Sequence, residues 1–245
     1  MSKPQDTKRQ NEMIFGAHSL LEVLKAKRRK IVGIYTTKVP PKIFDVILPL
    51  LPRAFPNIQY VSREVLDRMA DTQDHMGLIA WVSPFPFRTK MFSAKETPFI
   101  LLLDAIQDVR NLGAILRSAY CAGVGGVVLC KSKSAPLSGA AFKSSAGLAE
   151  HLEIYVAPSI KAAIDDIKRA GYQLYMAGFN GKNALEVSYK EKKCLVIGSE
   201  AVGITKEVIK SGELITLPQR LPDISYNASV AAGILIFLMA NNAKK

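Results

Sequence analysis

The sequence predicts an α/β protein in which a smaller α/β unit precedes a larger unit with an open, mainly parallel sheet. Apolar runs of strand length alternate with stretches of helical periodicity along the chain. Several runs, such as FILLLD, are apolar throughout, which is typical of strands buried on both faces of a parallel sheet. The proline-rich stretch SPFPFRTKMFSAKETP has no steady period, so we predict units at 1–83 and 99–245 and a linker at 84–98.

The smaller unit opens with a helix, because apolar residues recur at helical spacing from Ala17 to Leu24. A second helix is expected around Ile43–Leu51, after two prolines, and a third from Ser62, which could cap it. The strands expected between and after these helices are IVGIY, IQYV and GLIAWV.

In the larger unit, apolar periodicity predicts one helix over Leu112–Tyr120 and another over Ile160–Ile167, ended by Gly171. A last helix is expected from about Tyr226 to the C-terminus. The expected strands are FILLLD, GVVLC, YQLYMAG, CLVIGS and LITLP.

The 245 residues carry a net charge of +12, and most of the positive excess lies in the first 95 residues. Such an excess favours a polyanionic partner, either nucleic acid or an anionic membrane surface. A basic protein with no such partner stays open as an alternative. The densest basic run, KAKRRK at Lys25–Lys30, is interpreted as an RNA contact or, alternatively, as a solvated helix end.

Several classes of function are disfavoured. The three cysteines form no C-x-x-C pair, and no H-E-x-x-H occurs, so we expect neither a disulfide framework nor a metal site. Neither a P-loop nor a dinucleotide-binding glycine fingerprint is present. The longest apolar run, about Ala228–Ala240, is too short to span a bilayer, so we expect a soluble, cytoplasmic protein without a membrane partner.

Three segments place polar residues and glycines at strand ends. In the first, Asn111 opens a helix that carries Arg117 two turns later, near the carboxyl end of a strand, where open α/β sheets keep their sites. The alternative is a helix cap at Asp108 or Asn111 followed by a solvated arginine.

In the second segment, Gly198 and Gly203 flank Ser199 and Glu200 where a strand turns into a loop. Glycines let a backbone approach a ligand closely, although they also simply make turns. In the third, Ser225-Tyr226-Asn227 opens the last helix, and Ser225 as an ordinary N-cap is the alternative to a functional role.

Together and in this order, N-L-G-A-I-L-R, G-S-E-A-V-G and S-Y-N-A-S resemble the three signature motifs of the SpoU (TrmH) family. The stretches IFGAHSLLEVL and HMGLIAWV also resemble its two-domain members, so the likeness covers the chain from about Met13. This family comprises RNA ribose 2′-O-methyltransferases of the SPOUT superfamily.

The resemblance implies a SPOUT-type sheet with a C-terminal trefoil knot, a homodimer, and S-adenosylmethionine bound in the knot. Periodicity alone would not suggest a knot, because knots are almost absent from proteins. By motif, the residues expected to bind the cofactor are Gly198, Leu217, Tyr226, Ile197, Ala177 and Gly178. The expected catalytic set is Asn111, Arg117, Glu200, Ser225 and Asn227.

The sequence departs from the family pattern at Val109, Ala201, Gln219 and Tyr226, where proline, glycine, methionine and leucine are usual. None of these changes removes a polar catalytic group, but Gln219 and Tyr226 could reshape the cofactor pocket. We therefore expect 2′-O-methylation of a ribose in RNA, with ribosomal RNA of the 23S type as the substrate. The alternatives are a tRNA methyltransferase and a non-catalytic RNA-binding assembly factor. Whether Arg117 acts as a base or as a phosphate clamp is left open.

Overall fold

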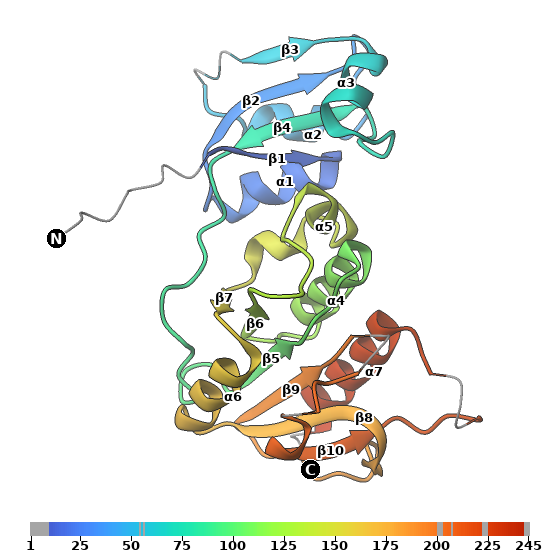
Figure 1. Cartoon of the computed structure of the whole chain (residues 1–245). Helices are drawn as coiled ribbons and strands as arrows, with labels where there is room; N and C mark the ends of the chain where they lie inside the picture. The colour runs from blue at the N-terminus through green and yellow to red at the C-terminus, as the bar shows by residue number, and fades with distance from the viewer. Residues whose placement is uncertain are drawn as a thin grey trace, which may run out of the picture.

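The chain forms two sheets, one above the other in Figure 1, which the computed structural model describes for residues 10–53, 55, 57–199, 203–206, 208–221 and 225–242. The upper sheet has four strands in the order β1-β4-β2-β3. Strand β4 runs antiparallel to β1 and β2, and β2 runs parallel to β3. The bounds are β1 Glu12–Phe15, α1 Ala17–Ala26, β2 Ile31–Thr36, α2 Phe44–Ile47, a 3₁₀ turn at Leu48–Leu50, β3 Ile58–Tyr60, α3 Arg63–Ala70 and β4 Leu78–Val82.

The lower sheet has six strands in the order β10-β8-β9-β5-β6-β7, and all of its strand pairs are parallel. The predicted open parallel sheet is thus confirmed. The bounds are β5 Phe99–Leu103, α4 Val109–Cys121, β6 Gly126–Cys130, α5 Gly139–Ser144, a 3₁₀ turn η2 Leu148–His151, β7 Ile154–Ala157, α6 Ile160–Arg169, β8 Gln173–Asn183, β9 Lys193–Ile197, a 3₁₀ turn η3 Ile209–Ser211, β10 Glu213–Thr216 and α7 Ala228–Asn241.

Two strands and one helix were not expected from the sequence. Strands β1 and β7 have only four residues each, and α5 has six, so each is too short to show a clear period. The last helix begins at Ala228, two residues later than predicted, because Asn227 caps it.

The segment 84–98 is packed along the six-stranded unit. In Figure 1 it runs down one side of the molecule to the start of β5. Phe85, Phe92 and Ala94 are buried, and the backbone N–H of Arg88 donates to the carbonyl of Ile154 at 2.8 Å. Apolar burial therefore fixes the path of this segment, although its prolines suggested a linker.

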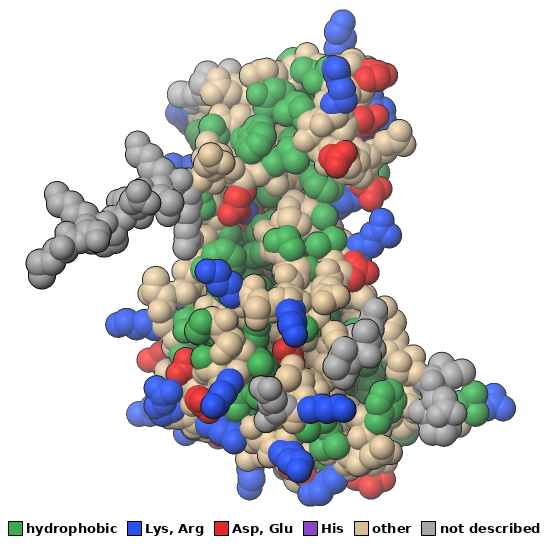
Figure 2. Space-filling model, in the orientation of Figure 1, with side chains coloured by type: hydrophobic (Ala, Val, Ile, Leu, Met, Phe, Trp, Pro, Cys, Tyr) green, Lys and Arg blue, Asp and Glu red, His purple; other side chains and the backbone are tan. Residues whose placement is uncertain are grey.

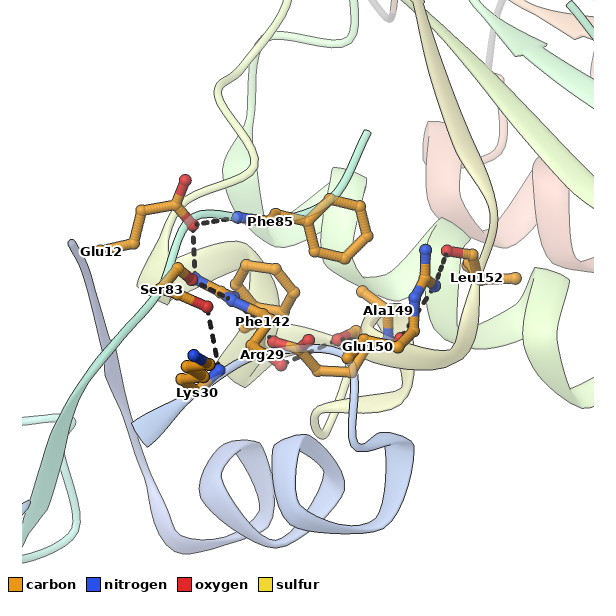
Figure 3. Close-up of polar contacts among 11 residues, drawn as sticks. Glu12, Arg29, Lys30, Ser83, Phe85, Phe142, Ala149, Glu150 and Leu152 are labelled. Atoms are coloured by element: carbon orange, nitrogen blue, oxygen red, sulfur yellow. Dashed lines mark hydrogen bonds and ion pairs between the residues drawn. The ribbon is translucent and has the colours of Figure 1, made fainter. Parts of the chain in front are cut away.

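A buried arginine joins the two units (Figure 3). The Arg29 guanidinium donates to the carbonyl of Ser83 at 2.7 Å and to Glu150 of η2 at 2.8 Å, and it also pairs with Glu12. It lies 5.1 Å from the centre of the Phe142 ring. Since this side chain is fully buried, its charge is matched by partners within the chain.

Two glycines allow the units to approach closely. A Cβ at Gly139 would lie 2.7 Å from the carbonyl oxygen of Met13, and one at Gly147 would lie 2.7 Å from that of His18. The basic run Lys25–Lys30 takes part in the same contact, because Arg28 and Arg29 both bond across it. We therefore correct the interpretation of the whole run as an RNA contact: its two arginines serve the joint between the units.

Candidate active site

A pocket of about 270 Å³ lies at the carboxyl ends of β8, β9 and β10, next to the start of α7. In a parallel sheet these strand ends share one edge, which is where open α/β sheets bind ligands. All six residues expected to bind the cofactor, together with Ser225, line this one pocket. The lining residues are Ala177, Gly178, Phe179, Ile197, Gly198, Ser199, Gly203, Ile215, Thr216, Leu217, Gln219, Ser225, Tyr226, Ala228, Ala231 and Leu235.

Glycine is required at the floor of the pocket. A Cβ at Gly198 would overlap the backbone of Gly203, so a larger residue would push this loop away from the sheet. Ser199 and Gly203 exchange two backbone hydrogen bonds, at 2.8 and 3.2 Å, which close a tight loop. Glu200, an expected catalytic residue, is inside this loop and lies outside the described residues.

Thr216 fixes the second wall of the pocket. Its hydroxyl donates to the carbonyl of Gly178 at 2.7 Å and accepts from the backbone N–H of Gly181 at 2.6 Å. These bonds hold the end of β10 against β8, where the pairing of the two strands shifts register. The sequence did not single out Thr216, because a threonine at a strand end is common.

Asp104 holds a third segment at this edge. It is the residue after β5, it is buried, and its carboxylate accepts from the backbone N–H and the hydroxyl of Thr205, at 3.0 and 2.7 Å. Two hydrogen bonds to a charged acceptor anchor the segment that follows the Gly203 turn. The sequence analysis missed this role, although a carboxylate directly after an apolar strand is a usable signal.

Two asparagines connect the first and third motifs. The amide of Asn227 donates to the side-chain oxygen of Asn111 at 3.2 Å. The side-chain oxygen Oδ1 of Asn227 also accepts from the backbone N–H of Ser229 and of Val230, so Asn227 is the N-cap of α7. Ser225, the expected alternative cap, instead lines the pocket, and Asp108 caps α4. Residues 116 positions apart are thereby brought together.

Arg117 lies on the outer side of α4. The helix buries Leu112, Ile115 and Ala119 against the core, whereas Arg117 is exposed. It has no hydrogen bond or ion pair to the residues that the structure describes, and it is not one of the side chains that line the pocket. The expected catalytic arginine and the expected cofactor residues therefore do not meet within one chain.

The chemistry of the pocket suits a ligand with an apolar, planar part. None of the described lining residues carries a formal charge near neutrality. Ile197, Ile215 and Leu217 supply apolar walls, and glycine backbone at Gly178 and Gly198 lets polar groups of a ligand approach N–H and C=O groups. This combination fits the adenosyl part of S-adenosylmethionine.

The described residues form neither a metal site nor a membrane-spanning helix. No group of three or more His, Cys, Asp or Glu side chains is placed to hold a metal ion. None of the described helices combines the length and apolarity needed to cross a bilayer.

Two family models match the chain. The SpoU rRNA methylase family matches residues 98–237, and a model of the substrate-binding region of RNA 2′-O ribose methyltransferases matches residues 13–88. Among curated proteins, the chain is similar to the 23S rRNA (guanosine-2′-O-)-methyltransferase RlmB of Vibrio cholerae. The two are 32% identical over 242 residues, which cover 93% of this chain and 95% of the relative.

Solved structures share the fold. An RNA 2′-O ribose methyltransferase superposes with a TM-score of 0.83 and 21% identity, over 97% of this chain and 90% of the other. An AdoMet-bound rRNA methyltransferase from Sinorhizobium meliloti superposes with a TM-score of 0.75 and 19% identity, over 94% and 87% of the two chains.

Proposed function

The chain belongs to the SpoU rRNA methylase family, and from this premise we propose that it methylates the 2′-hydroxyl of one guanosine in 23S-type ribosomal RNA. It is an RNA ribose 2′-O-methyltransferase that uses S-adenosylmethionine. The observation that carries the site assignment is the single pocket that collects Gly198, Leu217 and Tyr226 from separate segments. Because the curated relative RlmB of Vibrio cholerae is a bacterial enzyme, and bacteria make ribosomal RNA in the cytoplasm, we propose the same location for this protein.

When bound, S-adenosylmethionine supplies a methyl group on a positively charged sulfur. The chain's own residues bind this ligand and orient the target ribose. Apolar side chains of the pocket, such as Ile197 and Leu217, exclude water from the apolar face of the ligand. Asp104 and Thr216 hold the surrounding loops in place before the ligand enters, which reduces the ordering cost of binding.

Arg117 is best suited to holding the phosphate beside the target ribose. A guanidinium stays protonated near neutrality and is a poor proton acceptor, whereas its fork of donors matches phosphate oxygens. A fixed phosphate orients the ribose so that its 2′-hydroxyl faces the methyl donor. We assign ribose binding to Ser225, which lines the pocket, whereas Asn227 caps α7 and donates to Asn111, and so holds the first and third motifs together.

We assign the working form as a homodimer that pairs through α7. Val230, Ile234 and Phe237 form one apolar face of this helix and are 49%, 37% and 64% exposed. An exposed apolar stripe of this kind favours association. Because Arg117 does not line the pocket of its own chain, a second chain is also a natural source of the missing arginine. Sedimentation equilibrium tests this form, since a mass of one chain at all concentrations would contradict it.

The path of the C-terminal segment supports the trefoil knot that the family resemblance implies. Strand β10 lies at one edge of the sheet, yet the chain then returns so that α7 packs against α4 and β9. The segment anchored by Asp104 lies between β9 and β10 in sequence, and we propose that the returning chain passes through it.

Mapping of ribose methylation in total RNA, with and without the gene, tests the substrate. Loss of one 2′-O-methyl group from 23S rRNA is expected. Loss from a tRNA would support the alternative substrate. No change in either RNA, with normal binding of the cofactor and of RNA, would support a non-catalytic assembly factor.

A further inference from the structure

The only tryptophan of the chain lies at the surface of the four-stranded sheet without an evident structural role. Trp81 is in the middle of β4 and is partly buried. It does not pack against the buried apolar clusters, and its indole N–H has no hydrogen-bond partner among the described residues. A large aromatic residue with an uncovered face is a common anchor for a ligand.

The strand pairing leaves one flank of Trp81 open. Its neighbour on β1 is Met13, and its neighbour on β2 is Gly33. Gly33 does not have a positive φ, and a Cβ added there would meet no atom closer than 3.9 Å. Neither positive φ nor crowding therefore requires glycine, although the pairing of β2 with β4 shifts register between Ile31 and Gly33, where glycine is common. A glycine in such a position leaves room for a ligand to approach the backbone.

Tyr35 extends the same face of the sheet. It is two residues after Gly33 on β2, and its ring lies 3.9 Å from the position of a Cβ at Gly33. Side chains of the opposite face, such as Ile34 and Ala80, are buried in the core that includes α1 and α2. Trp81 and Gly33, with the Tyr35 ring at their edge, thus form an aromatic platform with a gap at Gly33. On the α3 side of this platform, Tyr35 packs against the small buried cluster of Phe15, Leu66 and Ile79. Figure 2 shows hydrophobic side chains over the upper unit, where this sheet lies in Figure 1.

A cleft leads from this face to the catalytic motif. Its volume is about 830 Å³, and Met13, the cross-strand neighbour of Trp81, lines it. The other wall includes the exposed Arg110 of the six-stranded unit and Lys143, whose ammonium pairs with Asp74 at 3.4 Å. Glu12 and Asp71 also line the cleft. Arg110 directly precedes Asn111, so the cleft ends beside the first signature motif.

We propose that Trp81, Gly33 and Tyr35 stack unpaired bases of the RNA that flank the target nucleotide. This proposal rests on the proposed function and adds the form of RNA recognised, which is single-stranded. Aromatic side chains stack on bases of any sequence, because every base has a π-face, and single strands are the usual targets of such stacking. The gap at Gly33 admits a base or ribose to the backbone, and the exposed Arg110, just before the first signature motif, can contact a phosphate.

The tryptophan itself reports on binding. Titration of the full-length wild-type protein with an oligouridylate of about a dozen nucleotides should quench the Trp81 fluorescence, because stacked bases quench indole. The same oligonucleotide in a duplex with oligoadenylate should quench little. Binding of the single strand without quenching, or equal quenching by the duplex, would overturn the proposal.

Variants separate stacking from structure. We expect Trp81→Ala to raise the Kd for the oligouridylate about fivefold to a hundredfold, with Trp81→Phe intermediate. The salt dependence of binding should keep its slope, because stacking releases no counterions. Gly33→Val should also weaken binding by filling the gap, while a β-branched residue keeps the strand stable. Tyr60→Ala is the control, since Tyr60 is exposed at a register position of the opposite face.

Two further measurements keep the outcomes distinct. Affinity for S-adenosylmethionine and thermal unfolding should not change in Gly33→Val and Trp81→Phe. If both variants bind the oligouridylate like the wild type, the platform is wrong even when ribosomal RNA is methylated normally. If the wild type is quenched and the variants are weakened but no RNA is methylated, the platform stands and the proposed methylation fails.

Discussion

Two arginines show how this molecule uses the same side chain in opposite ways. Arg29 is fully buried between the two units, and its guanidinium is shared by a carbonyl, two carboxylates and the Phe142 ring. Arg117 is exposed on α4 and has no recorded bond within the described chain. A charge that the fold has already neutralised stabilises the structure, whereas a charge left to solvent at a motif is available to a substrate.

The comparison is tested first by Arg29→Ala. This change leaves the buried groups around Glu150 without their cation, and it should lower the free energy of unfolding by about 3 to 5 kcal/mol. Urea denaturation measures the loss. Arg169→Ala is the matched control, because Arg169 forms an exposed ion pair with Asp166 and should cost under about 1 kcal/mol. Similar losses in both variants would mean that the joint is no more important than a surface pair.

Arg117→Ala should lower the rate of methylation and leave the stability of the fold nearly unchanged, which is the reverse of the effect of Arg29→Ala. Loss of a positioned charge at a reacting centre lowers the rate by at least about a hundredfold, while an exposed side chain contributes little to stability. Arg117→Lys should also fail, because an ammonium cannot reproduce the bidentate fork. Transfer of tritiated methyl groups to RNA gives the rate, and denaturation with cofactor titration checks fold and binding. Near-normal turnover of both variants would make Arg117 a solvated surface residue.

The stability of the joint between the two units should also depend on pH, through the carboxyl group of Glu150. Burial raises the pKa of this carboxyl to about 7 from 4.5, although Arg29 opposes the shift. Because the pKa of Glu150 is higher in the folded state than in the unfolded state, protonation of Glu150 stabilises the folded state, fully so below pH 4.5. This contribution to the free energy of unfolding is lost as pH rises through about 7. The loss is at most about 3 kcal/mol. Unfolding of the wild type and of Glu150→Gln from pH 5 to 8 measures it, since only the wild type should lose this contribution. Parallel curves would contradict the prediction.

The smallest expected effect concerns the departure from the family pattern at Tyr226. Its hydroxyl donates to the carbonyl of Pro218 over a long 3.4 Å, and the side chain is half-exposed. Tyr226→Leu should therefore change the affinity for S-adenosylmethionine by no more than about fivefold, the value of one weak hydrogen bond. Calorimetry measures the change. A larger loss would show that the tyrosine ring itself contacts the cofactor.

Local sequence patterns were enough to predict the long, regular elements of this protein. Continuous apolar runs such as 99–103 identified the central parallel strands, because burial on both faces leaves no room for polar residues. The family resemblance carried by the three motifs predicted the pocket residues, and the strand ends of the parallel sheet bring these residues together at one edge. Short elements such as β1 and β7 were not predicted, because four residues are too few to show a period.

The burial and contacts of residues that look alike in the sequence depend on the tertiary structure. Arg28 and Arg29 are adjacent in one basic run, yet only Arg29 is fully buried, because it is enclosed by Glu150 and Phe142 of the other unit. Arg28 instead reaches the partly exposed Glu153. Asp104 reaches Thr205 and Asn111 reaches Asn227 across more than a hundred residues. Trp81 faces Gly33 only because β4 pairs with β2 in one register. Such contacts follow from the packing of distant segments, which no local pattern encodes.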